Sequence, residues 1–374
     1  MPARSELNAV PFIDLSRGFA RDKEEIFDSW QRLGSHGSFV LGEEVREFEE
    51  RVAGYLGARH CVSVNSGSDA LWLSLKALGI GPGDEVITVA NTFIATVWAI
   101  AATGATPVMV DVGPDLNISP PAVETAITNN TRAIVSVHLA GNPAKLRELD
   151  LLSKAHNLIH LEDCAQAIGA CSDGKKIGSD SFVGAFSLHP LKNLGVLGDG
   201  GFVATHSDAV FEDLLLIRNH GLQNRDTAVM WGFNSRLDAF QAAVANIRLK
   251  KLDELNERRV EIANYYRERL AEFLGFQEVS EHSHCVFHNF IARSTRRDEI
   301  IEFAAAHGVE VKIHYPKPIH LLPIDGQPQI RADQPLSTTE ALAGEIFSLP
   351  IFPELTDSEV EMVEQTVRKF FDVC

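Results

Sequence analysis

The chain has 374 residues, of which 45% are hydrophobic and 23% are charged. This length exceeds the size at which a single hydrophobic core stops growing, so we expect two domains, and the composition excludes a disordered or collagen-like chain. The formal net charge of -17 at pH 7 excludes a general binding surface for nucleic acid or anionic membranes, because both would be repelled and no basic patch is present.

The cysteines and the apolar segments predict a soluble protein of the cytoplasm. Five cysteines are spread along the chain without a Cys-x-x-Cys pair, which argues against a disulfide framework or a zinc ribbon and favours a reducing compartment. The first residues contain no long apolar run of the secretory kind. Residues 86–110 carry no charge and could cross a bilayer by length, but Gly104, Pro107 and several threonines divide them into strand, turn, helix and strand. We therefore expect no membrane partner.

Short β-branched runs alternate with helical stretches between residues 60 and 205. Seven runs are predicted strands, at residues 61–65, 85–90, 106–111, 132–139, 158–163, 184–188 and 201–205. Runs that are apolar on both faces and separated by helices predict a mainly parallel sheet covered on both sides. In such sheets ligands bind beyond the carboxyl ends of the strands, so the motifs that follow these strands are candidates for a functional site.

The second part of the chain has a different pattern. A segment rich in Ala, Leu, Glu and Arg predicts a long helical region, with breaks, from about residue 238 to 274. Residues 284–293 and 309–315, with a helix predicted between them over 298–307, indicate a smaller α+β domain. We place the boundary so that residues 1–249 form the large domain and residues 250–374 the small C-terminal domain.

Three features follow predicted strands in chain order. Residues 65–71, Asn-Ser-Gly-Ser-Asp-Ala-Leu, open a helix and would offer free N–H groups to a phosphate, although a plain capped turn explains them as well. Asp163 ends a strand, where its carboxylate either caps a helix or binds a heterocyclic N–H⁺. Lys192 lies in an apolar run, where desolvation favours the neutral amine of Schiff-base chemistry, although lysines in glycine-rich loops are usually surface residues. The order of these features, with Ser187 five residues before Lys192, favours a functional site.

Two further clusters have the spacing of a metal or nucleophile site without the supporting residues. The segment 281–288 contains three histidines, but in a strand His284 and His288 share one face while His282 lies in the preceding loop, so we expect no metal site. Cys164, beside the strand-end acid, is expected to be a small buried side chain rather than a nucleophile.

Taken together, the motifs resemble those of the DegT/DnrJ/EryC1/StrS sugar aminotransferases, which belong to the fold-type I enzymes that use pyridoxal 5′-phosphate (PLP). The resemblance extends from FIDLSR near residue 12 to SLPIFPELT at residues 348–356. It implies an α/β protein with the PLP-dependent transferase fold, in which the large domain has a mainly parallel sheet flanked by helices. It also implies PLP as cofactor and a homodimer whose active sites are shared between two chains.

The resemblance implies a role for each residue that contacts the cofactor. Lys192 would bind PLP covalently and move the proton during transfer, and Asp163 would keep the pyridine nitrogen protonated. Gln166 would hydrogen-bond the ring hydroxyl, and Phe93 would stack on the ring. The phosphate would be held by Gly67, Ser68, Ser187 and, from the partner chain, Asn234.

The resemblance also implies a substrate pocket. The segment HYPKPIHLLP, residues 314–323, is similar to a loop that lines the sugar-nucleotide pocket, or it is a rigid connector with two X-Pro bonds. Its histidines and lysine would supply the positive or hydrogen-bonding groups that an acidic protein needs for a diphosphate. The expected substrate-binding residues are His189, Arg236, His314, Tyr315, Lys317 and His320. His189 stands where the family often has an aromatic residue.

We expect a PLP-dependent aminotransferase that converts a ketone on a nucleotide-linked sugar into an amine, with an amino acid donor, L-glutamate. The sequence KNLGVLGDGG resembles the branch of the family that aminates C3 of the hexose more than other branches. The expected substrate is therefore a 3-keto-6-deoxyhexose on a nucleoside diphosphate. The expected pathway is deoxyamino-sugar biosynthesis for a polysaccharide or an antibiotic. The alternatives are a 4-keto-sugar aminotransferase, a PLP-dependent sugar dehydratase or lyase, and a non-catalytic regulator. Lys192 argues against the dehydratases, which have histidine there, and with Asp163 and Gln166 it argues against the regulator.

Overall fold

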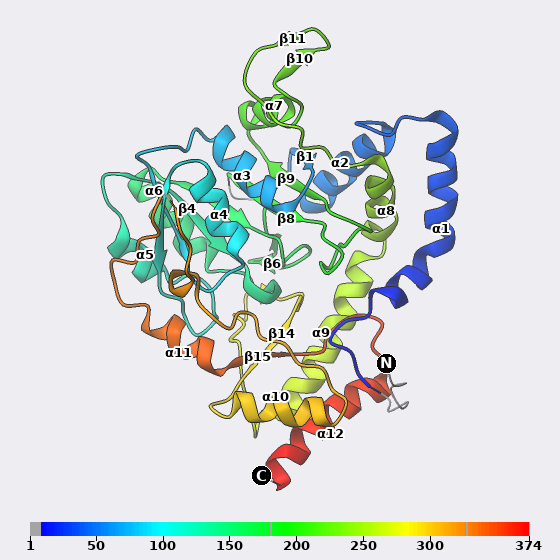
Figure 1. The fold of residues 1–374 in the computed structure, drawn as a ribbon, viewed down its shortest axis with the longest axis vertical. Helices are drawn as coiled ribbons and strands as arrows, with labels where there is room; N and C mark the ends of the chain where they lie inside the picture. The colour runs from blue at the N-terminus through cyan, green and yellow to red at the C-terminus, as the bar shows by residue number, and fades with distance from the viewer. Residues whose placement is uncertain (1–8, 180–181, 327, 374) are drawn as a thin grey trace.

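The computed structural model of the protein describes residues 9–179, 182–326 and 328–373. Its centre is a seven-stranded sheet with the strand order β1-β9-β8-β5-β4-β2-β3 (Figure 1). The strands are β1 (His60–Val64), β2 (Glu85–Val89), β3 (Thr106–Val110), β4 (Thr131–Val137), β5 (Ile159–Asp163), β8 (Val183–Ser187) and β9 (Gly201–Thr205). All seven predicted strands are present.

The sheet is mainly parallel, as predicted. Strand β9 runs antiparallel to both of its neighbours, β1 and β8, whereas the other neighbouring strands pair in parallel. The carboxyl ends of the parallel strands therefore meet at one edge of the sheet. Asp163 ends β5 at this edge and Ser187 ends β8, so the topology brings two of the predicted site residues to neighbouring positions.

Helices cover both faces of the sheet, which explains why its strands are apolar on both sides. One face packs against α3 (Gly67–Ala77), α4 (Ile94–Ala102) and α7 (Asp208–Ile217). The other face packs against α2 (Glu43–Leu56), α5 (Pro120–Ala126), α6 (Leu146–His156) and α8 (Ala239–Leu249), with α1 (Leu15–His36) outside α8. The mainly parallel sheet flanked by helices that was expected for the large domain is thus present.

A second apolar core lies below the sheet in Figure 1. We call the elements around it the C-terminal unit: β12 (Gly275–Phe276), β14 (Phe290–Arg293), β15 (Ile346–Leu349), α9 (Leu252–Leu270), α10 (Arg297–Ala306) and α12 (Asp357–Val373). Helix α9 joins the two cores, because Leu252 packs below the large sheet and Ile262 packs in the C-terminal unit. The boundary between residues 249 and 250 stays a prediction.

The structure places the details of two predicted segments. The helical region predicted over 238–274 is interrupted between α8 and α9, where the Nζ of Lys251 turns to the Asp22 carboxylate of α1, 3.1 Å away. Residues 309–315 form no strand: Val309 and Lys312 make only isolated bridges. Strand β14 is paired on both sides by β12 and β15, so this segment lies at the outer edge of β15, where the backbones of Lys312 and Ser348 bond to each other.

Shorter elements complete the described chain. They are the hairpin β10 (Leu222–Asn224) and β11 (Thr227–Ala228), the small sheet of β6 (Cys171–Ser172), β7 (Lys175–Lys176) and β13 (Ser283–His284), the helix α11 (Ser337–Glu345), and the 3₁₀ turns η1 (Leu139–Gly141) and η2 (Ile319–Leu321). The β10–β11 hairpin projects away from the body of the protein as an arm (Figure 1).

The outer edge of the sheet, strand β3, is covered by a later segment of the chain. The backbone N–H of Arg331 donates to the carbonyl of Pro107 at 2.9 Å, and the N–H of Met109 donates to the carbonyl of Arg331 at 2.7 Å. The Arg331 guanidinium also pairs with the Glu85 carboxylate of β2. These contacts cover an edge strand that would otherwise present unpaired backbone groups.

The uncharged segment of residues 86–110 forms β2, α4 and β3, as predicted. Among the residues that the structure describes, no helix is long and apolar enough to cross a membrane.

Candidate active site at the carboxyl edge of the sheet

Asp163 lies at the centre of the carboxyl edge and is buried. Its Oδ2 accepts a hydrogen bond from Thr96 Oγ1 at 2.8 Å, and its Oδ1 accepts one from the N–H of Ala165 at 3.1 Å. Burial raises the pKa of Asp163, while the bond from Thr96 and the nearby positive charge of Lys192 oppose this rise. A buried carboxylate that lacks full compensation favours a cationic partner.

Lys192 lies in the loop after β8, and its backbone N–H donates to the carbonyl of His189 at 2.8 Å. Burial lowers the pKa of the Lys192 ammonium to about 8, and the electrostatic attraction of Asp163 works in the opposite direction. A lysine with this pKa has a substantial fraction of neutral amine near neutral pH, as a nucleophilic lysine requires. The effect that was expected of apolar surroundings, a larger neutral fraction of the Lys192 amine, is therefore present.

Gln166 has its side-chain orientation fixed by the backbone. Its Oε1 accepts a hydrogen bond from the N–H of Ala140 at 2.6 Å, so its Nε2 is the donor, and this atom lies 3.2 Å from the hydroxyl of Tyr315. The Tyr315 ring in turn lies 6.2 Å from the ring of Phe93, centroid to centroid. Phe93 itself is 55% exposed at the N-terminus of α4, so its ring surface is accessible to a ligand.

The N-terminus of α3 forms a cradle that fits a phosphate. Ser66 caps the helix by accepting from the N–H of Asp69 at 3.1 Å. The first N–H groups of a helix, here those of Gly67 and Ser68, have no partner within the helix and attract an anion. A Cβ on Gly67 would lie 2.6 Å from the Cβ of Ser187, so only glycine allows β8 to approach the helix start this closely.

Four of the residues predicted to bind substrate lie beside Lys192 or in the first half of the segment 314–323. His189 is exposed next to Lys192, and the Nδ1 of His314 lies 3.0 Å from the Ser348 hydroxyl. Burial lowers the pKa of His314 to about 4, so this histidine is uncharged at neutral pH and can offer hydrogen bonds but no positive charge. Tyr315 contacts Gln166, and Lys317 is exposed.

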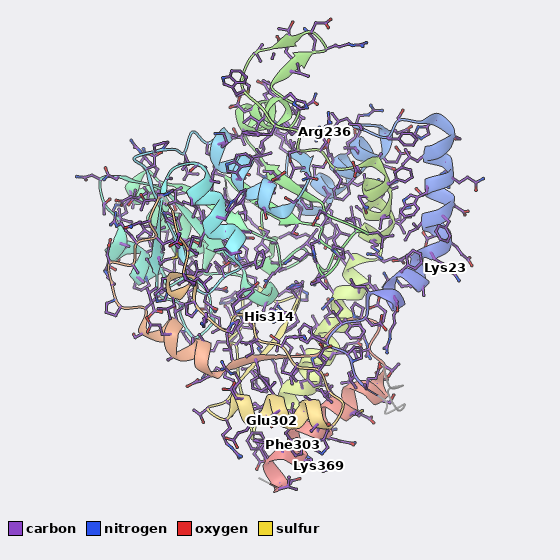
Figure 2. The ribbon with its side chains drawn as sticks, in the orientation of Figure 1. Lys23, Arg236, Glu302, Phe303, His314 and Lys369 are labelled. Atoms are coloured by element: carbon purple, nitrogen blue, oxygen red, sulfur yellow. The ribbon has the colours of Figure 1, made fainter. Side chains whose placement is uncertain are left out.

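The remaining predicted residues have contacts elsewhere in the chain. His320 is turned to α11, where its Nε2 lies 3.1 Å from the Glu340 carboxylate. Asn234 is exposed and pairs through its backbone with Asn219, whose side chain accepts a hydrogen bond from Arg236 at 2.9 Å. Figure 2 shows Arg236 near the base of the β10–β11 arm and His314 well away from it, next to the C-terminal unit.

Some residues of the site were not predicted. Thr96, the donor to Asp163, lies one helical turn after Thr92, and the two hydroxyls are 2.9 Å apart. Its place in ANTFIAT, beside the predicted Phe93, is a signal that could have identified it. The hydrogen bond from Ala140 to Gln166 comes from a backbone group with positive φ in η1, for which the sequence gives no signal.

We predicted no metal site at residues 281–288. In the structure, two histidine side chains of this segment contact separate partners. His284 approaches Glu257 at 3.5 Å, whereas the Nδ1 of His288 lies 3.2 Å from Asn193 Oδ1. Elsewhere in the described chain, ligand atoms of His138, Glu162 and Cys164 lie within 4.8 Å of one another. There, however, the Nδ1 of His138 accepts from the N–H of Ala144, so its Nε2 carries the proton that Glu162 accepts at 2.8 Å. A hydrogen bond therefore accounts for this group.

The residues at the carboxyl edge fit PLP. They combine a phosphate cradle, a buried carboxylate for a ring N–H⁺, an amide donor for a ring oxygen, an exposed aromatic face and an amine of lowered pKa: Gly67, Asp163, Gln166, Phe93 and Lys192. Each chemical group of the cofactor thus has a matching group on the protein.

Two relatives extend over nearly the whole chain. The dTDP-3-amino-3,4,6-trideoxy-alpha-D-glucose transaminase of Streptomyces venezuelae is 41% identical over 99% of this chain and 98% of its own length. A pleiotropic regulatory protein of Geobacillus stearothermophilus is 39% identical over 97% of this chain and 98% of its own length.

Two solved structures have the same fold. DesV of S. venezuelae, in complex with a ketimine intermediate, superposes with a TM-score of 0.95 at 41% identity and covers 98% of this chain and 99% of its own. NtdA of Bacillus subtilis, with the bound cofactor PMP, has a TM-score of 0.91 at 30% identity and covers 98% of this chain and 86% of its own.

These likenesses confirm the fold that the sequence predicted. A family model matches residues 20–368, from within α1 to within α12. The chain belongs to the DegT/DnrJ/EryC1/StrS aminotransferase family.

Proposed function

We propose that this aminotransferase uses PLP to convert a 3-keto sugar, carried on a nucleoside diphosphate, into an amino sugar, with L-glutamate as the amino donor. The observation that carries the proposal is the pairing of Lys192, whose pKa is lowered to about 8, with a buried Asp163 at the same edge of the sheet. Fold-level likeness alone would leave the chemistry open, because one fold supports many reactions.

The chain's own residues account for both halves of a transfer. PLP, when bound, supplies a carbonyl carbon that takes up the amino group and a conjugated ring that withdraws electrons from the neighbouring bond. Asp163 would hold the proton on the ring nitrogen, and Gln166 would donate its Nε2 hydrogen to a ring oxygen. Lys192, as a neutral amine, would move a proton from the donor's α carbon to the cofactor carbon that takes up the amino group, and in the sugar half it would move a proton from that carbon to the sugar carbon.

Amination at C3 is the finer part of the proposal. It is supported by the sequence motif KNLGVLGDGG and by the name of the S. venezuelae relative, which describes a 3-amino sugar on dTDP. A pathway to a deoxyamino sugar of a polysaccharide or an antibiotic follows from such a product, and the cytoplasm remains the proposed location.

A shared active site in a homodimer is a further part of the proposal. Figure 2 shows Arg236 near the base of the arm and away from His314, and the family resemblance places Asn234 of one chain at the phosphate of the other, so a second copy is the proposed source of these groups. Trp231, three residues after β11, is 96% exposed, and large exposed apolar side chains favour a protein partner. Mixing Lys192→Ala and Asn234→Ala proteins should create one intact site in each mixed dimer, and activity above that of either variant alone would support sharing.

The proposal is tested by visible absorption of the protein with PLP, before and after L-glutamate is added. We expect a band in the visible region that glutamate bleaches, and a 3-keto sugar nucleotide should then restore it. A band that glutamate leaves unchanged would contradict glutamate as the donor and favour a dehydratase or lyase. If no band forms, the assignment of Lys192 is wrong.

The lowered pKa of Lys192 gives a separate prediction. The rate at which cofactor-free protein captures PLP should rise with pH and level off above about 8, because the neutral amine is the nucleophile. Stopped-flow absorption across this pH range measures the midpoint. A midpoint near the ordinary lysine value of 10.5 would contradict the effect of burial.

A further inference from the structure

A chain of directed hydrogen bonds passes through Asn193, the residue after Lys192. The Nδ2 of Asn256, in α9, donates to the carbonyl of Ile168 at 3.1 Å, so the Oδ1 of Asn256 is left to accept. The Nδ2 of Asn193 donates to this Oδ1 at 2.7 Å and lies 3.2 Å from the carbonyl of Val286. The Oδ1 of Asn193 therefore points to His288.

This order determines the tautomer of His288. Its Nδ1 lies 3.2 Å from Asn193 Oδ1, which can only accept, so Nδ1 carries the hydrogen. In a neutral imidazole the other ring nitrogen, Nε2, is then an acceptor. The three side chains form one directed series that runs from His288 through Asn193 and Asn256 to the carbonyl after the Asp163–Gln166 segment.

The ends of this series are held by close packing. The guanidinium of Arg259 is buried, and its Nη1 lies 3.4 Å from both the Phe287 and His288 carbonyls. At the other end, a Cβ on Gly169 would lie 2.6 Å from Asn256 Nδ2, so the absence of a side chain there makes room for the amide. Neither the histidine nor the two asparagines can move without disturbing packed backbone.

Burial and positive neighbours keep His288 uncharged. Both effects lower its pKa well below the ordinary value. The positive or titratable groups that act on it are Lys192, Arg259, His314 and His189. A neutral His288 adds no second charge beside the Lys192 amine.

We infer that Asn193 and His288 are positioning residues for Lys192. The directed series holds the peptide after Lys192 at a fixed position relative to the segment that carries Asp163 and Gln166. This inference rests on the proposed function, in which the Lys192 amine leaves the cofactor during each turnover and has to return to the same place. A fixed neighbouring peptide limits the positions to which it can return.

The first test needs no activity. NMR of cofactor-free protein with ¹⁵N-labelled histidine should show His288 as the neutral tautomer with hydrogen on Nδ1 throughout the neutral pH range. The His288→Asn spectrum identifies its signal by subtraction. Hydrogen on Nε2, or titration near the ordinary histidine pKa of 6.5, would overturn the directed series.

The second test separates positioning from stability. In the PLP-loaded protein, His288→Leu should shift the pKa of the visible band by about one unit and lower kcat about tenfold with little change in the KM for glutamate. His288→Asn, whose amide can replace the Nδ1 donor, should restore most of both values. His284→Asn is the matched control, because His284 lies on β13 outside the series and its side chain is 42% exposed.

The outcomes distinguish the two proposals. A His288→Leu protein with a lower Tm but an unchanged band pKa and kcat would overturn the positioning role. If His288→Leu does not fold, the comparison of His288→Asn with Asn193→Ala, measured in the same way, decides it: equal losses would overturn the role. A wild-type protein that forms no band with PLP would overturn the proposed function, while the NMR result would still decide the directed series.

Discussion

The Lys192→Ala protein is expected to lose transamination by about a thousandfold or more. A positioned acid–base group alone contributes about 10²- to 10⁴-fold, and Lys192 also supplies the covalent attachment in the proposed function. The rate of the glutamate half-reaction in a single turnover measures this loss without the keto-sugar substrate. Cofactor binding through the α3 cradle should remain measurable, because Gly67 and Ser187 are unchanged.

Two comparisons make this result specific. Lys23 is an exposed lysine on α1, and Lys23→Ala should keep the wild-type rate (Figure 2). Lys192→Arg keeps a positive charge but offers no neutral amine near neutral pH, so it should be as inactive as Lys192→Ala. A Lys192→Ala protein with wild-type transamination would refute the proposed mechanism.

Asp163→Asn is expected to lower the transamination rate by about a hundredfold or more, the range found when a preorganised electrostatic group is removed from an active site. Asparagine has the same shape, and it can accept from the Ala165 N–H and donate to the Thr96 hydroxyl. The substitution therefore removes the charge that would hold the ring nitrogen protonated and leaves the local packing in place.

The stability of the same variant should change in the opposite direction. Burial raises the pKa of Asp163 in the cofactor-free protein, so the folded state binds its proton more tightly than the unfolded state does. Such a group lowers the free energy of unfolding as pH rises through the unfolded pKa towards the folded pKa. At neutral pH, cofactor-free Asp163→Asn should therefore be at least as stable as wild type in thermal unfolding. A marked drop in Tm would indicate a structural rather than an electrostatic role.

The strands were predictable and the breaks between elements were less so. Each strand of the main sheet is a β-branched run that is apolar on both faces, and local pattern and burial agree there. The break between α8 and α9 falls at Lys250 and Lys251, where no proline or glycine signals it, and it depends on a contact with Asp22 in another helix. Residues 309–315 have a strand-like composition, but they pair with β15 only at Lys312 and so make an isolated bridge.

The candidate site was predictable where a residue with unusual chemistry directly follows a predicted strand. Lys192 and Asp163 follow strands and have unusual surroundings, so the sequence identifies them. His288 was considered only as a metal ligand, because its actual partner, Asn193, is 95 residues away in the sequence. The charge of His314 was also unpredictable, since its lowered pKa depends on burial that only the folded chain produces.

The segment around Arg331 has a consequence for how the chain is made. It covers β3 only after more than two hundred further residues have been synthesised, because β3 ends at Val110. Until then a nascent chain presents an open apolar strand edge, which is a template for pairing with another chain. Truncation before Arg331 should consequently yield protein that aggregates on expression, even though every residue of the proposed cofactor site has already been translated.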